Sequence, residues 1–212
     1  MKTAHTLLQD TRAMPLVAIL RGLEPAHAVA IGEALFESGF RTLEVPLNRP
    51  GALQCIELLA RALPSTALVG GGTMLTVADV DAVHGAGGRL MVSPNCDVRV
   101  IAHAVALDML CAPGVATPSE AFAALQAGAH ALKIFPAEMV GHQGLKALIS
   151  VLPSGTDVWP VGGITPDNMG PWKHVGATGF GIGSQLYQPG ATAAEVLAKG
   201  THYVQAWANA CH

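Results

Sequence analysis

Two ionisable residues stand in segments that otherwise have the character of buried strands. Lys133 lies in ALKIFP (131–136) and Glu44 lies in TLEVPL (42–47). Lysine and glutamate are rarely buried unless they are paired or perform chemistry. Because desolvation disfavours an ammonium ion, a buried lysine holds more of the free amine that attacks carbonyl groups. The two residues therefore predict Schiff-base chemistry at Lys133, with Glu44 moving the protons.

A second interpretation of the same residues is a structural ion pair between their two strands, since ion-pair networks also hide charges. The Schiff-base interpretation needs no metal ion or other cofactor, because an iminium withdraws electrons as a Lewis acid would. None of the nine histidines falls within an expected strand, which disfavours a metal-dependent aldolase or epimerase.

Short apolar runs recur along the chain at a nearly constant spacing. Amphipathic segments separate them, a pattern that indicates parallel strands joined by helices. Eight such units predict an α/β protein with a closed (β/α)8 TIM barrel. The alternative is an open doubly wound sheet, which usually carries a GxGxxG turn that neither GGGTML (70–75) nor GIGSQL (181–186) completes. The expected strands are 16–20, 42–47, 67–72, 89–94, 108–114, 131–136, 157–163 and 179–184.

The segments between the strands carry helix signals. In SEAFAALQAG (119–128), Phe122 and Leu125 predict the inner face and Gly128 a stop, while Thr117 and Glu120 predict a capping box at the start. HTLLQDTRA (5–13) is expected to form an additional helix that covers the bottom of the barrel. No linker or low-complexity block interrupts the pattern, so residues 1–212 are expected to form a single domain.

Composition narrows the class of ligand. Half of the 212 residues are hydrophobic, 13% are charged and the net charge is -3, with no basic stripe for nucleic acid. A small neutral or anionic molecule is the expected partner. The four cysteines lie far apart, which is typical of reduced thiols, and no uninterrupted apolar run is long enough to span a membrane. A cytoplasmic location is expected, with neither a membrane nor a nucleic acid as partner.

In such a barrel, chemistry takes place where the strands end. Arg21 follows the first strand and could hold a carboxylate in bidentate fashion. The glycine-rich turns at 162–163 and 181–184 follow the last two strands, where many barrels bind phosphate through backbone N–H groups. These features predict a substrate with a keto acid at one end and a phosphate at the other.

The order of the motifs resembles that of the Entner-Doudoroff type keto-deoxy-phospho-sugar aldolases from about Leu16 to Tyr187. The segments that carry the resemblance are AILRG, TLEVPLN, GGGTML, VSPN, CAPGVATPSEA, LKIFPAE, VGGITPDN and GIGSQLY. The resemblance implies a class I aldolase that forms pyruvate and glyceraldehyde 3-phosphate, usually as a homotrimer.

The resemblance also assigns roles to individual residues. It implies Lys133 as the Schiff-base lysine and Glu44 as the general acid and base. It implies Arg21 and Thr73 at the pyruvate end and Gly162, Gly163 and Ser184 at the phosphate end. The remaining residues expected to bind substrate are Pro94, Phe135, Val161 and Gly183.

Two motifs depart from the phosphogluconate branch of this family, which typically has TLR and TGG. Here the corresponding segments are PLN (46–48) and VGG (161–163), which resemble the branch that acts on 2-dehydro-3-deoxy-6-phosphogalactonate. Cleavage of the galactonate epimer is therefore expected, and an arginine contact after the second strand is not. The gluconate epimer remains the alternative, since threonine and valine are similar in shape.

Two functions of other classes also stay open. A phospho-sugar isomerase or epimerase on the same barrel would use acid and base pairs without a covalent lysine. A phosphate-ligand binding protein would use the same anion contacts without catalysis. Reduction with borohydride in the presence of pyruvate separates these functions from a Schiff-base enzyme. Only a Schiff-base enzyme would keep the pyruvate as an irreversible covalent adduct and so gain its mass.

Overall fold

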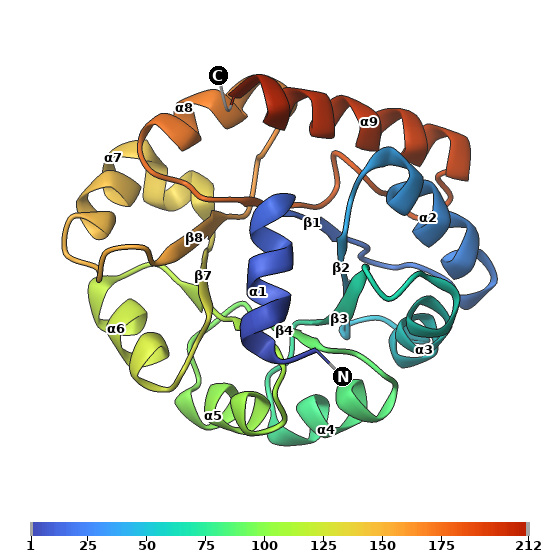
Figure 1. The fold of residues 1–212 in the computed structure, drawn as a ribbon, viewed down its shortest axis with the longest axis horizontal. Coiled ribbons are helices and arrows are strands. Elements are labelled where there is room, and N and C mark those ends of the chain that lie inside the picture. The colour runs from blue at the N-terminus through green and yellow to red at the C-terminus, as the bar shows by residue number, and fades with distance from the viewer. Residues whose placement is uncertain (1, 211–212) are drawn as a thin grey trace.

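The computed structural model describes residues 2–210, in which helices surround a core of parallel strands (Figure 1). The strands are β1 (Leu16–Ile19), β2 (Thr42–Pro46), β3 (Leu68–Gly72), β4 (Leu90–Val92), β5 (Leu110–Ala112), β6 (Gly114–Val115), β7 (Ala131–Ile134), β8 (Asp157–Pro160) and β9 (Phe180–Ile182). The helices are α1 (Ala4–Ala13), α2 (Pro25–Ser38), α3 (Ala52–Ala62), α4 (Val77–Gly85), α5 (Val98–Ala106), α6 (Pro118–Gln126), α7 (Ala137–Ile149), the short 3₁₀ helix η1 (Pro166–Asn168), α8 (Met169–His174) and α9 (Ala193–Ala210).

All strand pairs are parallel, and they form a curled α/β fold. One sheet has the order β5-β4-β3-β2-β1-β9 and the other the order β6-β7-β8. The expected fifth strand, 108–114, is divided into β5 and β6. Proline has no N–H to donate to a ladder, so pairing is interrupted at Pro113, although its carbonyl still accepts the N–H of Lys133 at 2.9 Å.

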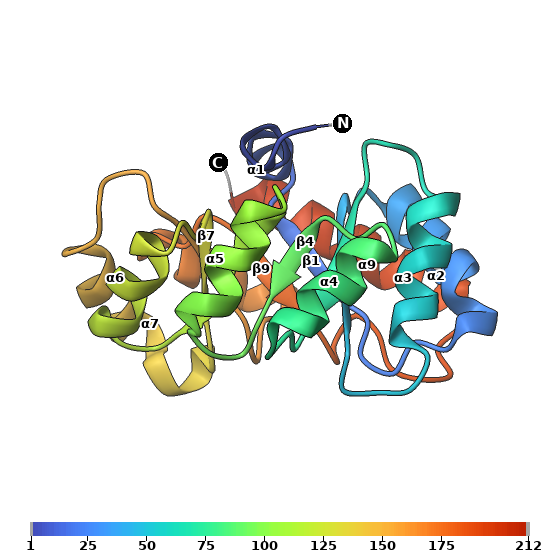
Figure 2. The ribbon, with the colours of Figure 1, turned by 90° about the horizontal axis from the view of Figure 1, so that it is seen from below.

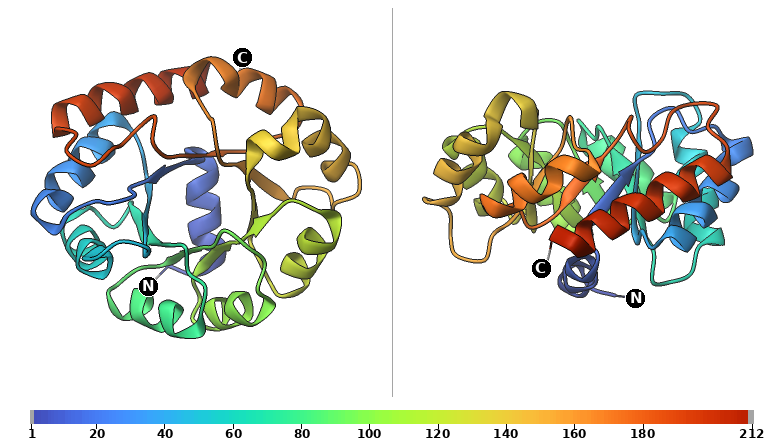
Figure 3. Two further views of the ribbon diagram at one scale, coloured as in Figure 1. Left: turned by 180° about the vertical axis from the view of Figure 1, so that it is seen from behind. Right: turned by 90° about the horizontal axis from the view of Figure 1, so that it is seen from above.

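The two sheets also meet between β8 and β9. Val161 and Gly181 form an isolated parallel bridge, and the N–H of Thr178 donates to the carbonyl of Val158 at 3.0 Å. Seen from behind, the helices follow one another around the strands in chain order (Figure 3). All carboxyl ends of the parallel strands therefore face the same side of the molecule.

Side chains alternate between the interior of the curled sheet and the helices outside it, as strand geometry requires. An inner apolar cluster contains Val17, Leu68, Leu90, Leu110 and Trp159, all of which are buried. The intervening residues, such as Leu43, Leu132 and Phe180, belong to the larger cluster between the strands and the helices. In this alternation, Glu44 and Lys133 belong to the positions that point inward.

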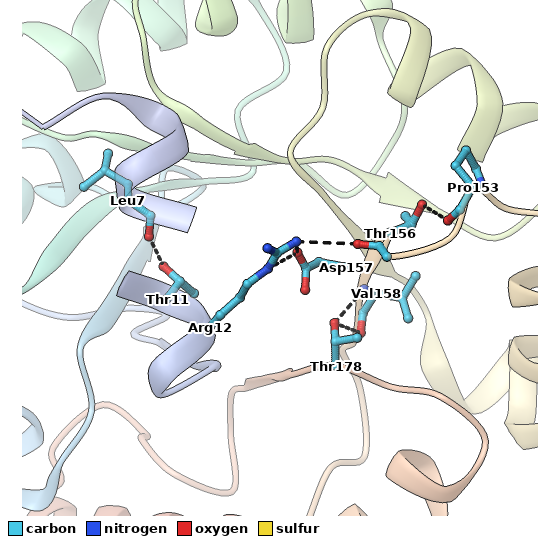
Figure 4. A network of polar contacts seen from close by, with 9 residues as sticks. Leu7, Thr11, Arg12, Pro153, Thr156, Asp157, Val158 and Thr178 are labelled. Carbon is cyan, nitrogen blue, oxygen red and sulfur yellow. Dashed lines mark hydrogen bonds and ion pairs between the residues drawn. The ribbon is translucent and has the colours of Figure 1, made fainter. Parts of the chain in front are cut away.

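The helix α1 lies across the end of the molecule where the strands begin (Figures 1 and 2). Its buried Leu8 joins the inner apolar cluster. Arg12 of α1 reaches the buried carboxylate of Asp157 at the start of β8, with Nη2 2.7 Å from Oδ2 (Figure 4). The backbone N–H of Ala4 donates to Asp108 at 2.8 Å, which attaches the other end of the helix.

The helix α6 begins as its sequence predicts, and Leu125 packs against the core as expected, but Phe122 does not. Thr117 and Glu120 form the expected capping box, with Pro118 in the first turn. The buried residues are Ala121 and Ala124, whereas Phe122 is exposed, so its prediction as an inner residue was wrong. The short alanine side chains let the helix pack closely on the strands, and Phe122, one residue further around the helix, points outward.

Three cysteines, Cys55, Cys96 and Cys111, are free thiols, and Cys211 lies outside the described residues. Among residues 2–210, no helix combines the length and the apolar character needed to cross a membrane.

Candidate active site

The inward-pointing Glu44 of β2 and Lys133 of β7 line one small cavity inside the strands. Only 2% of the Glu44 surface and 8% of the Lys133 surface are exposed. The other cavity walls are apolar or glycine: Val17, Val92, Ala112, Trp159, Val161 and Gly181. The structure thus brings the two ionisable residues singled out in the sequence to one buried, largely apolar cavity.

Gly72, the last residue of β3, makes room for Glu44. A Cβ atom at position 72 would overlap the carboxylate of Glu44, whose side chain lies over the glycine backbone. Any larger residue there would push the carboxylate out of its place. The third glycine of GGGTML therefore serves the glutamate rather than a dinucleotide.

Burial controls the ionisation of both groups. Desolvation raises the pKa of Glu44, and the nearby charges of Lys133 and Arg21 offset only part of this effect. Desolvation likewise lowers the pKa of Lys133. The charge of Arg21 lowers it further, and the charge of Glu44 offsets part of the decrease. Both pKa shifts therefore raise the share of the neutral forms: the free amine of Lys133, which is nucleophilic, and the protonated carboxyl group of Glu44.

The side chains of Lys133 and Glu44 are not bound to each other. Within residues 2–210, neither head group forms a hydrogen bond or an ion pair, and the Lys133 Nζ atom lies over the Phe135 ring, 4.9 Å from its centroid. The contacts of the described residues therefore do not favour a purely structural ion pair.

A wider cleft of about 430 Å³ opens at the carboxyl ends of β1, β7, β8 and β9. It shares Val161 and Gly181 with the small cavity, so the two spaces are adjacent. Seven residues expected to bind substrate line the cleft: Arg21, Phe135, Val161, Gly162, Gly163, Gly183 and Ser184. Arg21 is exposed there, yet its charge acts on the pKa values of both Glu44 and Lys133.

Thr73 and Pro94 follow β3 and β4 at the same edge but line neither of these two spaces in the described chain. Thr73 has φ = 55°, a left-handed backbone that is unusual for a residue other than glycine. Such strain is often found at functional sites. Pro94 packs against β6, because a Cβ atom on Gly114 would lie 2.5 Å from its carbonyl carbon.

Trp159, Glu138 and Tyr187 are among the wall residues that were not predicted from the sequence. Trp159 lines the small cavity, and its buried indole N–H has no partner within residues 2–210. Alternation along β8 is a signal that could have found it, since Trp159 pairs with Lys133 in the ladder. Glu138 and Tyr187 line the cleft. Glu138 is the last residue of the segment LKIFPAE, but its position in the sequence does not indicate that it lines a site.

The fold and the site together define a class of protein, an α/β enzyme with a buried lysine and glutamate at the carboxyl ends of parallel strands. Comparison with known proteins agrees with this class. Residues 7–201 match the family model of the KDPG and KHG aldolases. The chain belongs to the KDPG and KHG aldolase family, and it is accordingly an aldolase, a carbon-carbon lyase.

Individual relatives cover most of the chain. A 2-dehydro-3-deoxy-6-phosphogalactonate aldolase of Escherichia coli (strain K12) is 44% identical over 96% of this chain and 99% of its own. A probable 2-dehydro-3-deoxy-6-phosphogalactonate aldolase of Rhizobium meliloti (strain 1021) is 45% identical over 86% of each chain. A solved structure described as native KDPGal is 43% identical, with a TM-score of 0.91 over 93% of this chain and 96% of its own.

Proposed function

We propose that this protein is a class I aldolase that cleaves 2-dehydro-3-deoxy-6-phosphogalactonate to pyruvate and glyceraldehyde 3-phosphate. The observation that carries the proposal is the buried cavity shared by Lys133 and Glu44, in which desolvation lowers the pKa of Lys133 and so raises the share of free amine. Membership of an aldolase family argues against an isomerase or a non-catalytic binding protein. The relatives that act on the galactonate substrate by name support the choice of substrate.

The proposed reaction starts when the amine of Lys133 attacks the keto carbon of the substrate. Glu44 gives a proton to the carbinolamine oxygen, which leaves as water and yields an iminium. The iminium then accepts the electrons of the bond between C3 and C4, while Glu44 takes the proton of the C4 hydroxyl. An aldehyde leaves, and the remaining enamine is protonated and hydrolysed to pyruvate and free Lys133.

The cleft supports an orientation for this substrate. Arg21 is its one cationic wall residue in the described chain and is proposed, with Thr73 nearby at the strand ends, to hold the carboxylate. The turns at Gly162, Gly163 and at Gly183, Ser184 are proposed to bind the phosphate through backbone N–H groups. Pro94 and Phe135 are proposed to pack against the bound pyruvate.

Val161 is proposed to decide between the two epimers, which differ only at the C4 hydroxyl. It lines both the small cavity and the cleft, so it lies between the lysine and the phosphate turns. A valine offers no hydrogen bond to the hydroxyl of the gluconate epimer, whereas a threonine would. The wild-type enzyme is therefore expected to cleave the galactonate epimer with the higher kcat/KM.

The Val161→Thr variant should shift the ratio of the two kcat/KM values toward the gluconate epimer by about tenfold to a hundredfold, as one hydrogen bond of roughly 1–3 kcal/mol provides. Steady-state assays of both epimers measure this ratio. Val161→Ala is the control, because it changes the space without adding a hydroxyl. A wild-type preference for the gluconate epimer would refute the substrate assignment but not the Schiff base.

Activity should survive exhaustive chelation with EDTA, because the iminium on Lys133 supplies the electron sink. Within residues 2–210, no group of three or more His, Cys, Asp or Glu side chains is arranged to hold a metal ion. Turnover before and after chelation is the measurement. Loss of activity that a divalent metal restores would contradict the class I mechanism.

We further propose that the sheets close into a (β/α)8 barrel, covered below by α1, and that residues 1–212 form one domain. The hydrogen bonds across Pro113 and the bridge between Val161 and Gly181 support closure.

A homotrimer is also proposed. Four exposed apolar residues, Leu75, Val77, Val98 and Phe122, lie on or just before the consecutive helices α4, α5 and α6, and exposed apolar residues that gather on one side are typical of a subunit interface. The free thiols support a cytoplasmic location.

A further inference from the structure

Glu138 places a carboxylate against the turn to which the proposed function assigns the phosphate. A Cβ atom on Gly163 would lie 3.0 Å from its Oε1 atom, and one on Gly162 would overlap its Oε2 atom. The glutamate side chain therefore rests directly on the backbone of both glycines. It also lines the same cleft as Ser184 of the second turn.

The turn beneath Glu138 is held on both sides and cannot easily move away. The N–H of Val161 donates to Ile134 at 3.0 Å, and the N–H of Ala137 donates to Val161 at 2.9 Å. The Nδ2 group of Asn168 donates to the carbonyl of Gly163 at 2.7 Å. The first residues of α7 and the glycine turn are thus fixed to each other, which fixes the place of the Glu138 backbone.

The side chain of Glu138 itself is free to move. It is exposed, and among residues 2–210 it has no hydrogen bond or ion pair that would keep it on the turn. A carboxylate and a phosphate cannot share the space over the backbone of Gly162 and Gly163, because they overlap and repel each other. A phosphate that reaches the turn must therefore displace this side chain.

We propose that Glu138 occupies the phosphate end of the site in the free enzyme and leaves it when a phosphorylated ligand binds. This inference rests on the proposed function, which locates the phosphate at Gly162 and Gly163. Glu138 then acts as a built-in competitor that weakens the binding of substrate and of phosphorylated product alike. It is not placed among the groups that touch the reacting carbons, so turnover at saturation does not depend on it.

The test uses Glu138→Gln, which removes the charge at nearly constant size, and Glu138→Ala, which also removes the bulk. Inorganic phosphate serves as the probe, through its inhibition constant against aldol cleavage. Both variants should bind phosphate about three- to tenfold more tightly, as removal of one nearby like charge implies. The KM for the phosphorylated substrate should fall in parallel, with kcat within about twofold. Glu37→Gln is the matched control, because Glu37 is an exposed carboxylate at the far end of α2.

The outcomes separate this inference from the proposed function. Phosphate that inhibits the wild type but binds both Glu138 variants equally or more weakly would overturn the role of Glu138 alone. A wild type and variants that all fail to bind phosphate would overturn the phosphate end as well as this inference. Trapping of pyruvate on the enzyme, which involves no phosphate, should be the same in the wild type and in both variants.

Discussion

Replacement of Lys133 by methionine should reduce turnover by at least about 10⁴-fold, because the covalent route is lost altogether. Methionine keeps most of the length and fits the apolar strand between Leu132 and Ile134, but it has no amine. The variant should also gain no mass when it is incubated with pyruvate and borohydride. Steady-state kinetics and intact-protein mass spectrometry measure the two effects.

Folding of this variant needs its own control, because Glu44 would then be buried without a cation beside it. Burial already raises the pKa of Glu44, so the lone carboxyl group is expected to take up a proton and remain inside. Circular dichroism and thermal melting should show a folded protein. Lys146→Met on the exposed side of α7 is the matched control and should retain activity and trapping. A folded Lys133→Met enzyme that still forms the pyruvate adduct would exclude Lys133 as the nucleophile.

Replacement of Glu44 by glutamine should lower turnover by about 10²- to 10⁴-fold, which is the usual contribution of a positioned acid or base. Glutamine has nearly the same shape, so the space over Gly72 stays filled, but the side chain can no longer exchange a proton. Lys133 is still present in this variant, so the adduct with pyruvate should form, only more slowly. The rate of adduct formation therefore separates proton transfer from nucleophilic attack.

Glu57→Gln is a suitable control for Glu44→Gln, because Glu57 lies on the surface of α3 in an ion pair with Arg61. It should leave turnover within about twofold of the wild type, as surface ion pairs contribute little. If Glu44→Gln cleaved substrate at the wild-type rate, Glu44 would be no more than a buried neighbour of Lys133.

Much of the fold could be predicted from periodicity. Each of the eight apolar runs contains strand residues, because a parallel strand covered on both faces has to be apolar throughout. The division of the fifth strand at Pro113 could not be predicted, since it depends on whether strand pairing needs a backbone N–H at that position, which proline lacks. The prediction that Phe122 lies on the inner face of α6 was wrong, whereas Leu125 packs against the core as predicted. Large residues such as Phe122 dominate a periodicity count, although alanines make the close contact.

The candidate site likewise contains residues that could be predicted from the sequence and residues that could not. Lys133 and Glu44 could be found because charge inside an apolar strand is costly, and this cost is visible in the sequence. Alternation along β8 could have placed Trp159 on the same face as Lys133, but only the three-dimensional structure shows that its buried indole N–H has no partner within residues 2–210. Glu138 was missed because the start of α7 approaches the glycine turn that follows β8 only in the folded chain, where Glu138 meets Gly162, 24 positions away in the sequence.

The position of the covalent adduct tests the proposed mechanism most directly. The wild-type enzyme is incubated with pyruvate, reduced with borohydride, digested and mapped by peptide mass spectrometry. The Schiff-base mechanism predicts one reduced pyruvate per chain, attached to Lys133 in the peptide that contains LKIFPAE. An adduct on Lys146 or Lys173, or no adduct at all in an enzyme that cleaves substrate, would contradict it.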